Sequence, residues 1–95
     1  MNTNLFEELL EPKELNDWIM AIQHLRDAEA EMSKDIPSLG RIYRLLLDSE
    51  LCLAWARREG LVPSEGDLHD VLLQHGNLYS RLISLRKAVK AAVAE

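Results

Sequence analysis

Residues 65–94, EGDLHDVLLQHGNLYSRLISLRKAVKAAVA, decide the fold. Their apolar positions recur at intervals of three and four residues, the spacing that places side chains on one face of an α-helix. The register continues across Gly76, where a genuine turn would ordinarily reset it. We therefore predict one helix over 65–94 that tolerates an internal glycine at a cost of about 1 kcal/mol. The residues in this register are Leu68, Val71, His75, Leu78, Leu82, Leu85, Val89 and Ala92.

An alternative interpretation places Gly76 in the turn of a helix-turn-helix over residues 64–87. The second helix would then present Tyr79, Ser80, Arg81 and Arg86 to DNA. The unbroken register argues against this, and so does the net charge of −5, because DNA binders neutralise phosphates with a basic surface. Nucleic-acid binding is therefore the less favoured alternative.

Two further helices precede this one. Pro12 suits the first turn of a helix and Pro37 forbids its continuation, which predicts a helix over about 12–34. Asp35 or Ser38 is a suitable cap for the next helix, predicted over about 36–59. That helix ends at Gly60, which suits a left-handed C-terminal position. It is apolar around most of its circumference, so we expect it to be the most buried element, with Leu46 and Leu53 in the core.

These elements predict an all-α fold, an antiparallel three-helix bundle that forms a single domain over residues 1–95. Asn4 and Glu7 resemble a capping box, which adds a short helical turn through Leu10. The sequence has neither alternating apolar runs nor an Asn-Gly or Asp-Gly hairpin signal. The last helix is the longest, so its final turns are expected to project beyond the bundle.

Composition points to a soluble protein of the cytoplasm. The 95 residues are 47% hydrophobic and 28% charged, with no apolar stretch near the roughly 20 residues of a membrane span. The first residues lack the basic start and apolar run of a secretion signal. The single cysteine, Cys52, has no partner for an internal disulfide, which is typical of a reducing compartment.

No set of residues in the sequence indicates catalysis or metal binding. His24, His69 and His75 lack the spacing of metal ligands, and Cys52 lies between two leucines, which predicts a buried and unreactive thiol. We expect no catalytic residue, no cofactor and no metal site. His75 is expected to be a neutral core histidine bonded to a backbone carbonyl or a neighbouring side chain; a pH-sensitive interface residue is the alternative.

Glu50 is the most unusual acid in the sequence, because the helical wheel places it inside the apolar arc of the helix over 36–59. A buried carboxylate must be paired or protonated. We expect a pair with Tyr79, Arg81 or His75, or partial exposure at a groove of the bundle. The alternative is a polar specificity residue in an interface with a partner or a second copy.

Leu51 and Trp55 fall on the polar side of the same helix, beside Arg44 and Arg58. A tryptophan and a leucine among arginines resemble the composition of interaction hot spots, so these four residues are predicted to bind a partner. In the alternative, the N-terminal segment around Phe6 and Leu9 covers them.

The acidic first part of the chain suggests a second part of the interface. Residues 1–40 carry nine acids and three bases, a net charge of −6, which favours a partner with a basic surface. Asp27 and Glu31, on the expected solvated side of the helix over 12–34, are the predicted contacts.

These patterns favour a small, acidic, non-enzymatic helical protein that binds another protein and regulates or inhibits it. Inhibitors, antitoxins, immunity proteins, anti-defence proteins and secretion chaperones share this physical profile as a class. The alternatives are a structural homo-oligomer, such as a homodimer, and the helix-turn-helix DNA binder. No membrane contact is expected.

Overall fold

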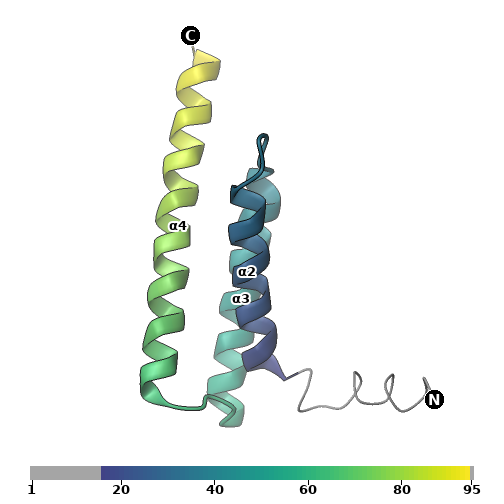
Figure 1. The fold of residues 1–95 in the computed structure, drawn as a ribbon, viewed down its shortest axis with the longest axis vertical. Helices are drawn as coiled ribbons and strands as arrows, with labels where there is room; N and C mark the ends of the chain where they lie inside the picture. Colours follow the sequence, from purple (N-terminus) through teal and green to yellow (C-terminus); the bar gives the residue numbers. More distant parts are fainter. Residues whose placement is uncertain (1–15, 95) are drawn as a thin grey trace, which may run out of the picture.

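The computed structural model describes residues 16–94 and contains three helices there, with no strand among them. They are α2 (Asp17–Met32), α3 (Leu39–Glu59) and α4 (Glu65–Ala94). The chain runs up α2, down α3 and up α4, so neighbouring helices are antiparallel (Figure 1). The predicted all-α three-helix bundle is confirmed. None of the helices in the described range has the length and apolarity needed to cross a membrane.

Helix α2 is shorter than predicted. Asn16 is extended, with φ −69° and ψ 160°, and its side-chain oxygen accepts a hydrogen bond from the Ile19 N–H at 2.9 Å. This cap starts the helix at Asp17, so the predicted helix over 12–34 is wrong at Asn16, because a capping asparagine has a non-helical backbone. The helix ends at Met32, two residues early. Residues 12–15 and the predicted turn over 4–10 lie outside the described residues.

Helix α3 begins three residues later than predicted and ends at the predicted position. Ser38 is its cap, with a hydroxyl that accepts from the Arg41 N–H at 3.3 Å, so the start at residue 36 is wrong. At the other end Gly60 takes φ 73°, the left-handed value expected for a glycine after a helix. The Leu61 N–H then donates to the Ala56 carbonyl at 2.9 Å.

Helices α2 and α3 form the closest pair in the bundle. Ala21 and Ala28 of α2 and Ala56 of α3 are fully buried, and their small side chains let the two backbones approach. Between them the Ser49 hydroxyl, also fully buried, donates to the Ala21 carbonyl at 3.0 Å. This bond satisfies a buried polar group and fixes how far α3 slides along α2.

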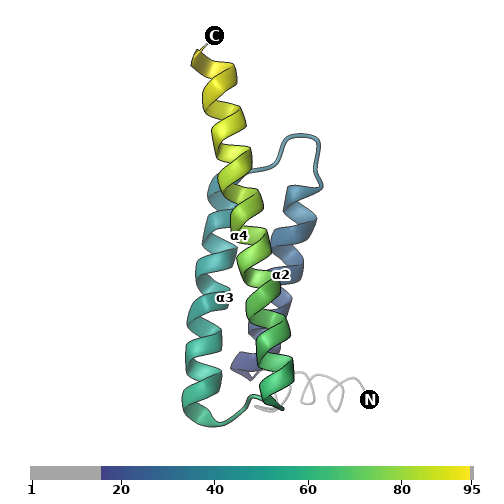
Figure 2. The ribbon, with the colours of Figure 1, turned by 90° about the vertical axis from the view of Figure 1, so that its left-hand side faces the viewer.

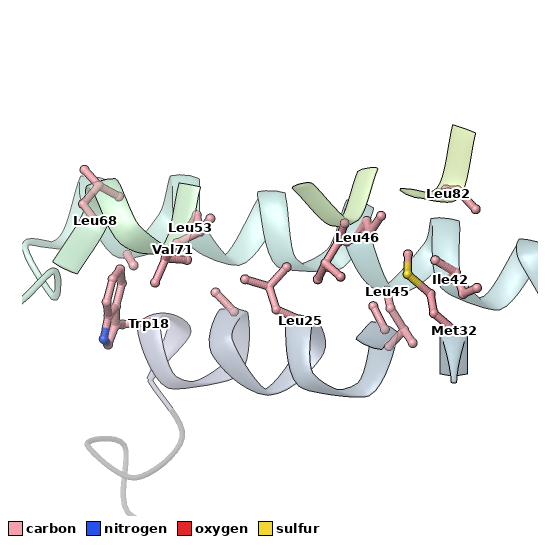
Figure 3. Packing of buried hydrophobic residues seen from close by; sticks show 14 residues of the cluster. Trp18, Leu25, Met32, Ile42, Leu45, Leu46, Leu53, Leu68, Val71 and Leu82 are labelled. Carbon is pink, nitrogen blue, oxygen red and sulfur yellow. The ribbon is translucent and has the colours of Figure 1, made fainter. Parts of the chain in front are cut away.

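The core follows the length of this pair and receives α4 on one side. Trp18, Leu53, Leu68 and Val71 gather at one end, and Met32, Ile42, Leu45 and Leu82 at the other, with Leu25 and Leu46 between them (Figure 3). The predicted burial of Leu46 and Leu53 is confirmed.

Helix α4 is one continuous helix through Gly76, as the register predicts. Gly60 is the only described residue with a positive φ, so Gly76 needs no special backbone conformation. The turn that a helix-turn-helix over 64–87 requires is therefore not formed. The upper end of α4 extends past the other two helices (Figures 1 and 2), and the residues from Arg86 to Ala91 are exposed.

Glu31 holds the end of α2 to the start of α3. We expected this side chain in solvent, but it is only 4% exposed, so that expectation is wrong. Its carboxylate accepts the Ser38 N–H at 3.0 Å and pairs with Lys34 Nζ at 3.0 Å and Arg41 Nε at 3.2 Å. The Ser38 hydrogen bond, followed by Lys34 and Arg41, holds the Glu31 pKa below its ordinary value.

We predict that Gly76→Ala stabilises the protein by up to about 1 kcal/mol, because alanine loses less backbone entropy in a helix. No atom outside the helix backbone lies within 4 Å of the methyl group that this change adds. Thermal unfolding at low protein concentration should show a higher midpoint. A lower midpoint would contradict the helical conformation at Gly76.

We predict that Glu31→Gln lowers the unfolding temperature at neutral pH by several degrees, because the amide loses both ion pairs. Folding lowers the pKa of Glu31 from its ordinary value of 4.5. The stability that the ionised carboxylate contributes is therefore complete at pH values above 4.5, and it disappears as the pH falls through the lower pKa of the folded state. The difference from wild type should therefore shrink in acid. Glu29→Gln, an exposed change two residues away, is the control and should have little effect. A Glu31→Gln difference that stayed constant into strong acid would contradict this role.

Candidate protein interface

The residues that we predicted to bind a partner on α3 form one exposed face of that helix. Leu51 is 59% and Trp55 48% exposed. Arg44, Leu51 and Arg58 are seven residues apart in turn and therefore share one side of the helix, while Trp55 follows Leu51 by one turn. We call Arg44, Leu51, Trp55 and Arg58 the outer face of α3.

Two charge contacts order this outer face. The Arg58 guanidinium lies 5.4 Å from the centre of the Trp55 ring, within the range of a cation–π interaction. Arg44 Nε lies 3.7 Å from the Asp48 carboxylate, one turn along the helix. The two large apolar side chains are thus bordered by two arginines, Arg44 and Arg58.

The two predicted acidic contacts on α2 have different surroundings. Asp27 is half-buried and accepts a hydrogen bond from the Gln23 amide at 3.1 Å. Glu31 is buried, and its carboxylate is engaged by Ser38, Lys34 and Arg41. Partner binding by these two residues remains a prediction, but Glu31 would have to give up bonds within the chain to take part in it.

A groove of about 580 Å³ lies between α3 and α4, and sequence reasoning did not identify its apolar lining. Its walls are mainly apolar, with charged groups on the α3 side. We call it the α3–α4 groove. Its lining consists of Leu47, Glu50, Leu53, Ala54 and Arg57 from α3 and Leu72, His75, Gly76 and Tyr79 from α4. The sequence held one sign of this groove, because Leu72 is apolar although it falls outside the buried register of α4. In the structure Leu72 is 46% exposed.

Glu50 is exposed on the wall of this groove, so its expected place inside the apolar arc is wrong. Between Leu46 and Leu53 the buried position of α3 is taken by Ser49, and Glu50, one residue further along the helix, lies past the edge of the buried face. Within the described part of the chain, the expected pair with Tyr79, Arg81 or His75 is not formed. The alternative of exposure at a groove of the bundle matches its position.

His75 joins α4 to α3, as expected for a core histidine. Its Nε2 atom lies 3.1 Å from the Leu46 carbonyl oxygen. A carbonyl only accepts hydrogen bonds, so Nε2 carries the proton and donates it. The half-buried imidazole also stacks on Tyr79, with ring centres 6.3 Å apart. This places the Tyr79 ring at the border of the α3–α4 groove.

Cys52 is half-buried, less enclosed than the buried thiol that the sequence predicts. Burial raises its pKa, and the nearby carboxylates of Asp17 and Asp48 raise it further. Because the thiolate is the reactive form, these surroundings disfavour nucleophilic chemistry. The expected unreactive thiol agrees with this direction. Across residues 16–94, His, Cys, Asp and Glu side chains form no group of three or more that suits a metal ion.

A comparison of this chain with models of protein families, with curated proteins and with solved structures found no match in any of the three.

Proposed function

We propose that this protein is a non-enzymatic helical module that binds another protein through the outer face of α3 and thereby regulates or inhibits it. The observation that supports the proposal most directly is the joint exposure of Leu51 and Trp55, 59% and 48%, on the same helix, α3. Large apolar side chains that remain exposed together mark interaction sites more often than ordinary surface does.

The energetics of such a contact favour these residues. Fully burying a leucine-sized side chain contributes about 1.5–3 kcal/mol, and tryptophan and arginine dominate measured hot spots. Arg58 already lies over the Trp55 ring, so a partner orders these two side chains at a reduced entropic cost. The outer face is thus a small preorganised anchor.

The charges of this protein indicate two properties of the partner, its overall charge and the groups at the contact. The net charge of −5 favours approach to a protein whose overall surface is basic. At the contact itself, Arg44 and Arg58 border the apolar residues and need acceptors opposite them. A basic partner with an apolar pocket bordered by carboxylates or carbonyls meets both requirements.

The proposal is tested by affinity capture from the native host with wild-type protein and three variants. We expect one protein to be recovered by wild type, and at least about tenfold less of it by Leu51→Ser and by Trp55→Ser, since the loss of a hot spot exceeds 1 kcal/mol. Ile19→Ser removes a comparable exposed apolar side chain from α2 and should not affect recovery.

Two outcomes would contradict the proposal. Equal recovery by all three variants would place binding elsewhere on the molecule. The absence of any protein retained specifically by wild type would remove the basis for a regulatory partner. Circular dichroism of each variant checks that these surface changes leave the helices intact.

A further inference from the structure

One stripe of α3 has the pattern of a helix–helix seam, although neither of the other two helices in residues 16–94 covers it. The residues Tyr43, Leu47, Glu50, Ala54 and Arg57 are spaced by four, three, four and three. This is the repeat of a coiled-coil seam, in which the side chains interlock with a facing helix. Tyr43 is 46% exposed, and the other four residues line the α3–α4 groove.

The two charges of this stripe are unpaired within the described part of the chain. Neither the Glu50 carboxylate nor the Arg57 guanidinium has an ion pair or hydrogen bond to another described residue. They are seven residues apart on one side of α3, about 10.5 Å along the helix axis. Ala54, the small residue nearest the midpoint between them, lets a second backbone come close.

We propose that a second copy of this chain occupies the α3–α4 groove, with the two α3 helices packed antiparallel around a two-fold axis near Ala54. The axis brings Glu50 of one copy opposite the partner's Arg57, and symmetry forms the same pair again on the other side. Helices α3 and α4 of both copies then make a four-helix layer, with the apolar lining of each groove covered by the other copy.

Charge symmetry favours a second copy over a different protein. Glu50 and Arg57 lie at equal distances on either side of the proposed axis near Ala54, so the segment of the stripe from Glu50 to Arg57 is complementary to itself when reversed. An interface between identical copies requires this self-complementarity. The apolar lining of the α3–α4 groove supplies buried area. The Glu50–Arg57 pairs set the direction and the register of one α3 helix relative to the other.

Gly76 is consistent with the same arrangement. It lies on the α4 wall of the groove in a helical conformation, and no atom outside its helix backbone lies within 4 Å of a methyl group added there. The fold of one chain therefore gives no reason for a glycine at this position. A second helix lying in the groove provides one, because it approaches this wall.

This proposal goes beyond the partner-binding role of the outer face of α3 and does not depend on it. Trp55 follows Ala54 by one residue and so points about 100° away from the seam. It does not line the groove. The dimer therefore leaves Trp55 available, and the failure of one proposal does not affect the other.

The test is the molar mass of the purified chain by light scattering or sedimentation between about 1 µM and 1 mM, the range of moderate and weak association. We expect wild type to become a dimer as its concentration rises, and Glu50→Arg and Arg57→Glu each to weaken dimerisation at least about tenfold, because like charges face each other twice. The double variant E50R/R57E restores both pairs with reversed signs and should dimerise again.

Mixing the two single variants gives the sharpest result. The E50R seam is wholly positive and the R57E seam wholly negative, so an equimolar mixture should form a heterodimer although each variant alone is monomeric. Glu29→Arg, an exposed charge reversal on α2, is the control: it should dimerise like wild type, and because its unchanged seam keeps only one attractive pair with R57E, it should associate with R57E more weakly than E50R does. A wild-type monomer throughout the concentration range, or single variants that dimerise like wild type, would overturn the proposal.

Discussion

The close packing of α2 against α3 is the constraint on which the rest of the structure depends. Three buried alanines let the backbones approach, and the hydroxyl of Ser49 reaches the Ala21 carbonyl across the interface. A buried hydroxyl without a partner costs about 1–3 kcal/mol, so this bond selects one axial position of α3 over its neighbours. In that position the Glu31 carboxylate accepts a hydrogen bond from the N–H of Ser38, the N-cap of α3, and so holds the short connection between the two helices.

The exposed surfaces follow from this arrangement. Helix α2 covers one side of α3 and α4 covers part of another, so the remaining circumference of α3 is exposed. It holds two adjacent surfaces of different character, the outer face with its arginines and the seam beside the α3–α4 groove. Helix α3 buries one face against the other two described helices and still exposes large apolar side chains, among them Leu51 and Trp55.

The sequence predicted well the features that depend on the spacing of apolar residues. It predicted less well the features that depend on the contacts of one polar side chain. Unbroken spacing predicted the continuous helix through Gly76, and Gly60 predicted the end of α3. Asn16 was misplaced because its side-chain cap competes with the helical backbone. The role of Glu31 depends on Ser38 and Arg41 in another element, which no local pattern shows. Glu50 sits at a groove edge set by the position of α4, and a helical wheel of α3 alone does not contain that information.

Native-state hydrogen exchange tests most directly whether the α2–α3 pair is the rigid unit of this bundle. The account predicts that amides around Leu25 in α2 and Leu46 in α3 exchange most slowly, through global unfolding, because both side chains are fully buried. Amides of α4 from Arg86 to Ala91, where the side chains are exposed, should exchange much faster. Protection in that last part of α4 equal to that of α2 and α3, or early opening of α2 while α4 stays protected, would contradict it.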